Sequence, residues 1–292
     1  CVLRSCLAEA GSHPVSVGDY ALHYNYASLR VRKAPSAYGW DIMPRTVSCG
    51  LWRGVSLILA PEARIEQAYL YTASLEAGRA DLRLFYELRL PQGQDGRYRL
   101  HLSARCGDSA LEHTFTPFWQ AGQEKLSLPS PRLWWPRGQG EPNLYDCRLT
   151  LYHGDTVADE RAFTLGVRTV ELSRTSLTDE AGSGDFCFVI NGRRVFLLGT
   201  NWVPADAFHS RDEARIPAIL QLAWDSGVNC LRCWGGNVYE DHAFFAECDR
   251  RGLVVWQDFA MACGLYPQDD AFAAALRTEA VAIVRRLRQH PS

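Results

Sequence analysis

Polar and aromatic side chains follow three hydrophobic segments in the last third of the sequence. They lie at 199–202, 232–236 and 256–259, and they include tryptophan, asparagine and aspartate. An indole ring offers a flat apolar face, and the two short polar side chains offer hydrogen-bonding groups. This combination suits a pocket for a ring that carries hydroxyl groups, such as a sugar. The sequence therefore predicts carbohydrate binding at the ends of these segments.

Strands and helices alternate from about residue 185 onward, and this alternation would position those side chains. The apolar runs predict strands near 195–200, 228–233 and 253–258, and the amphipathic stretches predict helices near 211–226, 239–251 and 269–289. Such repetition is typical of a parallel sheet. In a parallel βα barrel the functional residues sit at the C-terminal ends of the strands.

The length of this zone limits the fold. A complete eight-fold barrel takes about 250 residues, and residues 185–292 are too few for it. Three βα units alone would leave a sheet edge and a sheet face uncovered. Two alternatives remain, an open doubly wound domain or a TIM barrel cut off at Ser292.

Two β-rich zones precede the strand–helix repeats. Residues 61–172 contain several short segments of alternating apolar and polar residues, such as 82–90, with Gly, Pro and Asp clusters between them. This pattern predicts an immunoglobulin-like β-sandwich. Residues 1–60 are strand-like, with a strand–turn–strand expected at 47–59, and they are interpreted as the C-terminal part of a β-domain. The chain begins without Met, so we expect a fragment.

Composition excludes several functional classes. The net charge of -2 comes from interspersed charges, which argues against a nucleic-acid partner. No apolar run reaches the roughly 18 residues of a membrane span. The ten cysteines are dispersed, and we interpret them as free thiols of a reducing, cytoplasmic compartment. A signal peptide that preceded residue 1 is the alternative. Cys230 and Cys233 have CxxC spacing without a second pair, and no metal site or cofactor motif is expected.

Four stretches resemble the β-mannosidase branch of glycoside hydrolase family 2. The first includes Tyr38-Gly39-Trp40-Asp41-Ile42-Met43-Pro44-Arg45 and Gly50-Leu51-Trp52-Arg53; the second is Leu133-Trp134-Trp135-Pro136; the third is Gly166-Val167-Arg168-Thr169; the fourth runs from 191 to 291 and includes Trp234-Gly235-Gly236-Asn237. The match covers most of residues 30–292 in the family's order. The resemblance implies three domains: part of a sugar-binding jelly-roll-like β-sandwich at 1–60, an immunoglobulin-like β-sandwich at 61–172, and a truncated (β/α)8 TIM barrel at 173–292.

The resemblance also implies an activity. Members of this branch are retaining exo-glycosidases that release terminal β-D-mannose from the non-reducing end of glycans. They use two glutamates, one as acid/base and one as nucleophile, whose carboxyls lie ~5–5.5 Å apart. In the family these glutamates follow later barrel strands, so we expect both beyond residue 292 and no catalytic residue here. The partner would be an oligosaccharide or glycoside, and a homodimer is left open.

Five residues are expected to bind substrate. The resemblance implies that Asp41 reaches the barrel mouth and binds sugar hydroxyls, and that Trp234 lines the sugar pocket. A turn aspartate and a core tryptophan are the structural alternatives. Asn201 would bind a hydroxyl or orient a carboxylate, unless it satisfies its own loop backbone. Trp202 is assigned to the same site, although packing is its favoured role, and Asp258 is expected to order neighbouring Arg or Asn side chains.

Glu240 and Glu279 are not expected to be catalytic. Glu240 is expected to open a helix, where a carboxylate favours the helix dipole, and Glu279 to be solvated on the last helix.

Three departures from the family pattern surround the expected pocket. The family's second Trp in GWDWGPR is Ile42 here, the next Gly is Met43, and the third Gly after Trp234 is Asn237. These changes leave two neighbouring specificities open, exo-β-glucosaminidase and β-galactosidase. A non-catalytic carbohydrate-binding β-sandwich protein is the alternative from a different class, although it would not explain the βα units.

Overall fold

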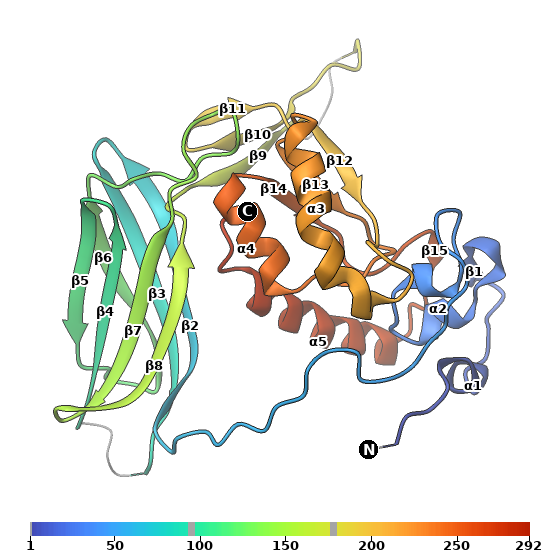
Figure 1. Cartoon of the computed structure of the whole chain (residues 1–292), viewed down its shortest axis with the longest axis horizontal. Helices are drawn as coiled ribbons and strands as arrows, with labels where there is room; N and C mark the ends of the chain where they lie inside the picture. Colours follow the sequence, from blue (N-terminus) through green and yellow to red (C-terminus); the bar gives the residue numbers. More distant parts are fainter. Residues whose placement is uncertain (1, 93–96, 176–179) are drawn as a thin grey trace. The chain divides into compact units, whose positions relative to one another are not determined.

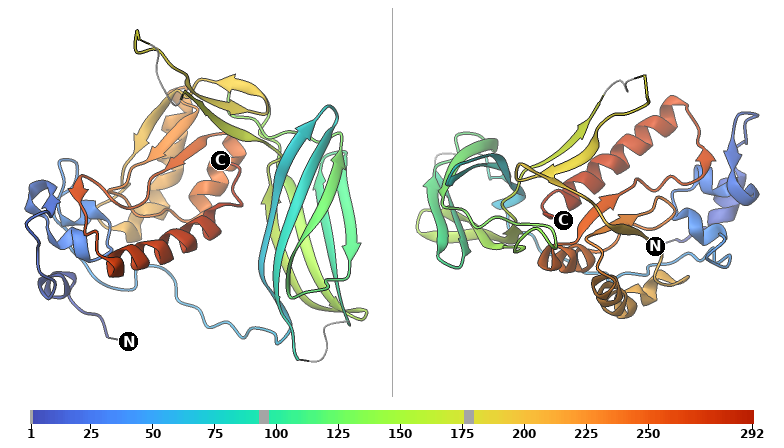
Figure 2. Two further views of the ribbon diagram at one scale, coloured as in Figure 1. Left: turned by 180° about the vertical axis from the view of Figure 1, so that it is seen from behind. Right: turned by 90° about the horizontal axis from the view of Figure 1, so that it is seen from above.

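The computed structural model describes residues 2–92, 97–175 and 180–292. The chain divides into two compact units. The βα unit consists of Cys1–Leu57, Leu198–Phe245 and Val255–Arg286, and the β unit of Ile58–Leu197, Ala246–Val254 and Leu287–Ser292. Figures 1 and 2 show the helices and strands of both units.

The β unit is built on two antiparallel sheets. One sheet has the order β2-β3-β6, with β2 at Arg64–Glu76, β3 at Arg79–Arg89 and β6 at Ala121–Pro129. The other has the order β5-β4-β7-β8, with β5 at Ser109–Phe115, β4 at Tyr98–Cys106, β7 at Tyr145–His153 and β8 at Thr156–Leu165. The alternating strands expected in 61–172 are therefore present.

One hydrophobic core joins the two sheets. Buried residues alternate along β3 and β4, because successive side chains of a strand point to opposite faces. Leu82 and Leu84 of β3 belong to the same buried cluster as Leu100 and Leu102 of β4. This shared core makes the two sheets one packed β structure, and the immunoglobulin-like assignment stays a prediction.

A small sheet and two later segments of the chain, Ala246–Val254 and Leu287–Ser292, complete the β unit. The sheet has the order β11-β10-β9, formed by Val170–Arg174 (β9), Phe186–Ile190 (β10) and Arg193–Val195 (β11). Trp134 is 1% exposed, and its indole N–H donates to the Asp249 carbonyl oxygen at 2.8 Å. The Gln289 side chain bonds to backbone groups of Leu70 and Thr164. Parts of the range predicted as barrel, 246–254 and 287–292, thus pack within the β unit.

Three strands and three helices follow the expected alternation. The strands are β12 (Gly199–Trp202), β13 (Cys230–Cys233) and β14 (Val254–Gln257), in the order β12-β13-β14. The helices are α3 (Asp212–Asp225), α4 (His242–Arg251) and α5 (Asp270–Leu287), and a short 3-10 turn, η4 (His209–Arg211), precedes α3. These elements belong to the βα unit except for residues 246–251 of α4, Val254 of β14 and Leu287 of α5, which belong to the β unit. β12 and β13 pair in parallel, as predicted. The complete TIM barrel stays a prediction.

The first 60 residues contain short elements instead of the expected strands. They are α1 (Cys6–Gly11), β1 (Tyr20–Ala21), η1 (Leu22–Tyr24), α2 (Ala27–Arg30) and η2 (Pro35–Tyr38), and β1 pairs with β15 (Gly264–Leu265). The strand–turn–strand expected at 47–59 is wrong, because this stretch has no regular secondary structure. A strand needs a neighbour's ladder of hydrogen bonds. None of the described strands pairs with this stretch, and Val55, Leu57 and Leu59 are exposed.

Nine cysteines fall within the described residues, and none of these nine forms a disulfide bond there. Cys230 and Cys233 are buried in β13, and burial raises the pKa of the Cys230 thiol to about 11. Within 2–92, 97–175 and 180–292, no three His, Cys, Asp or Glu side chains are grouped to hold a metal ion. Among the same residues, no helix combines the length and hydrophobicity needed to cross a lipid bilayer.

The shared core of the β unit yields a stability prediction. Leu102→Ala removes a fully buried side chain, so we expect the free energy of unfolding to fall by about 2–5 kcal/mol. Denaturant unfolding followed by circular dichroism measures it. Val157, which is 53% exposed on β8, provides the control, since Val157→Ala should change stability by less than about 0.5 kcal/mol. Equal losses in both variants would contradict the shared core.

Candidate functional site

The C-terminal ends of β12, β13 and β14 lie side by side at one edge of the parallel sheet. Trp202 of β12 is in register with Cys233 of β13. The backbone N–H of Trp234 donates to the Trp202 carbonyl oxygen at 3.3 Å, and that of Asp258 donates to the Cys233 carbonyl oxygen at 3.0 Å. The backbone therefore brings together the strand ends that carry four of the five predicted site residues.

Asp258 organises a polar network across these strand ends. Its Oδ2 lies 2.6 Å from Arg232 Nη2 and also accepts the backbone N–H of Gly235 at 3.3 Å. Arg232 Nη1 in turn donates to Asn201 Oδ1 at 3.4 Å. The network spans all three strands, and it fits the ordering role expected of Asp258. Direct contact of Asn201 with a sugar stays a prediction.

The turn that carries Asp41 lies against the end of β13. Trp40 and Met43 pair across the turn through two backbone hydrogen bonds, and Asp41 is exposed between them. The Trp40 ring meets the Trp234 ring edge to face, with 5.1 Å between the ring centroids. Asp41 and Trp234, which are 193 positions apart in sequence, are therefore linked through Trp40.

Gly236 makes room for the Trp234 indole. A Cβ atom at Gly236 would lie 2.0 Å from the Trp234 ring, so only glycine fits beneath the indole. The carbonyl oxygen of Gly236 also accepts the backbone N–H of Ser36 at 3.0 Å. The backbone after β13 thus supports the indole and holds the segment that leads to Asp41.

Trp202 is buried, in line with the packing role that the sequence favoured for it. Trp202 is 3% exposed, its ring packs against Phe244 with 4.7 Å between centroids, and its indole N–H donates to Glu240 Oε1 at 2.9 Å. A side chain with no free face or polar edge cannot contact a sugar in this structure. Trp202 instead packs beneath the strand ends, the alternative that the sequence favoured.

Glu240 differs from its expected position. It was expected to open a helix, but it lies two residues before α4, which begins at His242, and its side chain is 2% exposed. Its Oε1 accepts both the Trp202 indole N–H and the Asn237 amide N–H, the latter at 3.3 Å. Burial raises the pKa of the Glu240 carboxyl, and the nearby Asp212 contributes to the rise. Sequence reasoning missed this buried carboxylate, since only the Asn-x-x-Glu spacing hints at it.

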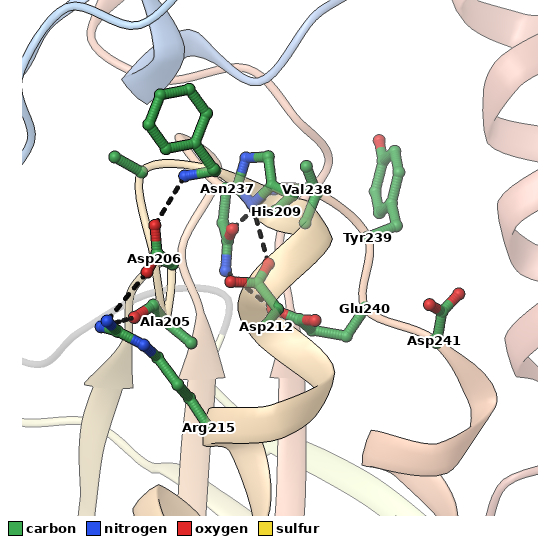
Figure 3. Close-up of polar contacts among 12 residues, drawn as sticks. Ala205, Asp206, His209, Asp212, Arg215, Asn237, Val238, Tyr239, Glu240 and Asp241 are labelled. Atoms are coloured by element: carbon green, nitrogen blue, oxygen red, sulfur yellow. Dashed lines mark hydrogen bonds and ion pairs between the residues drawn. The ribbon is translucent and has the colours of Figure 1, made fainter. Parts of the chain in front are cut away.

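A second polar cluster fixes the connection between β12 and α3 (Figure 3). His209 Nδ1 lies 2.8 Å from Asp212 Oδ2, and both side chains are nearly buried. Asp206 accepts the backbone N–H of Phe208 at 2.8 Å and forms an ion pair with Arg215 at 3.0 Å. These contacts hold the connection that follows the end of β12.

Glu279, which was expected to be solvated, is half-buried and paired. Arg32 Nε and Nη2 each lie 2.8 Å from one carboxylate oxygen of Glu279, and the Tyr239 hydroxyl donates to the same carboxylate at 2.8 Å. The Arg32 guanidinium holds the pKa of Glu279 below its usual value. This bidentate pair fastens the N-terminal segment to α5 and to the loop after β13.

The carboxylates near the strand ends differ in their surroundings. Asp258 is paired with Arg232, and Glu240 is buried and accepts the Trp202 indole N–H. Asp41 is exposed and can accept hydrogen bonds from two hydroxyls. Trp40 and Trp234 provide the adjoining aromatic surface.

Comparison with known proteins gives consistent matches. The family model "Glycosyl hydrolases family 2" matches residues 63–168. The chain is 34% identical to β-mannosidase B of Thermothelomyces thermophilus, over 90% of this chain and 31% of the relative. It is 32% identical to the β-mannosidase of Capra hircus, over 96% of this chain and 32% of the relative. The chain thus spans about a third of these relatives.

A solved structure matches nearly the whole chain. The β-D-mannosidase of Dictyoglomus thermophilum superposes with a TM-score of 0.86 at 32% identity. The match covers 98% of this chain and 35% of that structure.

The buried carboxylate predicts a pH effect on stability. The ordinary pKa of a Glu carboxyl is 4.5, and burial raises that of Glu240, so folding disfavours its ionised form. Stability should therefore be lost as the pH rises from about 4.5 through the raised pKa of the folded state. Glu240→Gln keeps an acceptor oxygen but cannot ionise, so this variant should gain unfolding free energy relative to the unmodified chain over that interval.

Denaturant unfolding at several pH values between about 4 and 8 measures the difference. Glu213→Gln, an exposed position on α3, controls for the loss of a charge. A difference that does not vary with pH, or the same variation in Glu213→Gln, would contradict the assignment.

Proposed function

The chain belongs to glycoside hydrolase family 2, and we propose that it is part of an enzyme that releases terminal β-D-mannose from the non-reducing end of glycans. The observation that carries the proposal is the Trp40–Trp234 contact. It joins the exposed Asp41 turn to the end of a parallel strand, where an α/β enzyme binds its ligand. The similarity to β-mannosidases over most of the chain supports the choice of sugar.

Substrate recognition is assigned to the exposed Asp41 and to the half-buried Trp234. The Asp41 carboxylate would accept hydrogen bonds from two neighbouring hydroxyls of the terminal sugar. The Trp234 indole would pack against a face of the ring. Asn201 and Asp258 would act through Arg232, because their side chains are held by its guanidinium. Trp202 would support this surface from beneath.

We assign the chemical step to a two-glutamate double displacement with retention of configuration. It requires an acid/base and a nucleophile with carboxyls ~5–5.5 Å apart. We place both glutamates outside residues 1–292. Two observations support this placement. Asp258 is paired with Arg232 and Glu240 is bonded to Trp202, and the chain spans only about a third of the length of its relatives.

The first experiment compares hydrolysis of p-nitrophenyl β-D-mannoside by this chain and by the complete gene product. We expect turnover only by the complete product, because the catalytic pair is assigned to other segments. The β-glucosaminide and β-galactoside are tested alongside and should be poorer substrates. A better rate on either would reassign the sugar. Turnover by this chain alone would overturn the placement of the glutamates, and no turnover by either protein would favour a binding protein.

Asp41→Ala in the complete gene product tests substrate recognition. We expect kcat/KM for the β-mannoside to fall more than tenfold, which is a loss of at least ~1.4 kcal/mol of transition-state binding. The melting temperature should not change, because Asp41 is exposed. Asp155→Ala, at an exposed turn of the β unit, is the matched control and should leave kcat/KM unaltered. Unaltered turnover in Asp41→Ala would remove Asp41 from the site.

A further inference from the structure

A cavity of about 380 Å³ lies in the βα unit, and its lining includes none of the five predicted substrate residues. Three parts of the chain line it: the N-terminal segment, the loop after β13 and α5. Four basic side chains contribute to the lining, namely Arg32, Lys33, Arg53 and Arg286. We call this space the basic cavity.

Two of the four cations are already neutralised by neighbouring carboxylates. Arg32 forms the bidentate pair with Glu279. Arg53 lies 3.0 Å from Asp241 and donates to the Tyr239 carbonyl oxygen at 3.1 Å. Figure 3 shows Tyr239, Glu240 and Asp241 in sequence on the loop that leads into α4. The charges of Arg32 and Arg53 are therefore balanced by Glu279 and Asp241.

The other two cations have no ion-pair partner among residues 2–92, 97–175 and 180–292. Arg286 is the clearer case, because its Nε and Nη2 are buried and have no hydrogen-bond acceptor in that part of the chain. Lys33 is half-buried and forms no ion pair there. Burial, and then the positive charge of Arg53, lowers the pKa of Arg286, while the negative charges of Asp241 and Glu240 oppose this. A guanidinium with buried, unused donors calls for an acceptor.

The wall beside these cations is aromatic. Trp52 lines the cavity, and the Arg53 guanidinium lies over its ring at 4.3 Å from the centroid. The Tyr239 side chain, held by Glu279 and by the backbone N–H of Ala260, forms another part of the wall. The volume falls within the range of small-molecule sites. The cavity therefore combines unpaired positive charge with flat surfaces suited to a ring.

We propose that the basic cavity binds a sugar bearing an oxyanion, such as a phosphate ester, with the anion on Arg286 and Lys33. A guanidinium presents parallel N–H donors that match two oxygens of a phosphate. Lys33 adds a point charge. The site is separate from the one assigned to the β-mannoside, so it binds whether or not the chain catalyses hydrolysis.

Isothermal titration calorimetry on the 292-residue chain tests the proposal, with inorganic phosphate, glucose 6-phosphate and glucose as probes. We expect both phosphates to bind, glucose 6-phosphate more tightly, and glucose not to bind. Arg286→Gln should weaken phosphate binding by about tenfold or more, since it removes charged hydrogen bonds. Arg285→Gln is the matched control, because Arg285 is exposed on the same helix, and it should bind as the unmodified chain does.

Lys33→Gln provides a second test if Arg286→Gln does not fold. This variant should also weaken binding of both phosphates, while circular dichroism shows an unaltered fold. If inorganic phosphate binds as tightly as glucose 6-phosphate, the sugar contributes nothing to affinity. The ligand would then be a free oxyanion, and the sugar part of the proposal would be overturned. Absence of phosphate binding, or equal losses in Arg285→Gln and Arg286→Gln, would overturn the site itself.

Discussion

The parallel pairing of β12, β13 and β14 is the constraint on which the candidate site depends. Parallel strands end at the same edge of a sheet, so residues from three separate stretches of sequence meet there. The register of Trp202 with Cys233 places Trp234 one residue beyond the end of β13, where the chain is free to turn. A shift by one residue would turn every side chain of the strand to the opposite face. The Arg232–Asp258 pair would not survive such a shift, because it needs both side chains on one face of adjacent strands.

Beneath that edge, a buried carboxylate holds the layer that supports the site. An ionised group in an apolar interior is costly unless hydrogen bonds satisfy it. Glu240 offsets part of this cost by accepting from Trp202 on β12 and from Asn237 in the loop after β13, although burial still raises its pKa. The same bonds therefore fix the relative positions of a strand end and a loop. Glu279 acts similarly for the N-terminal segment, since Arg32 and Tyr239 converge on it.

Periodic elements could be predicted from the sequence, and isolated contacts could not. The sequence of β3 alternates apolar and polar residues with a period of two. The segments that form β12, β13 and β14 alternate with helical segments. Both are local patterns that can be recognised in the sequence. Residues 47–59 carry a strand-like pattern but lack a pairing strand in the described structure, so the pattern alone misled. Glu240 bonds to Trp202, 38 positions away, and Glu279 bonds to Arg32, 247 positions away. No pattern near either glutamate encodes these distant partners, which is why neither the burial of Glu240 nor the pairing of Glu279 was predicted.

The buried position of Asn237 changes the meaning of one departure from the family pattern. The resemblance suggested that Asn237, standing where a glycine is usual, bears on sugar specificity. Asn237 is 2% exposed, its amide N–H donates to Glu240, and its Oδ1 accepts the backbone N–H of Val238 at 2.7 Å. A glycine could make neither side-chain bond. Asn237 therefore stabilises the buried contacts around Glu240 and Trp202, and it does not form part of the pocket surface. Ile42 differs, because it is 48% exposed and directly follows Asp41. Any change in specificity that the departures cause should therefore arise at the Asp41 turn, where an apolar side chain adjoins the carboxylate assigned to the hydroxyls.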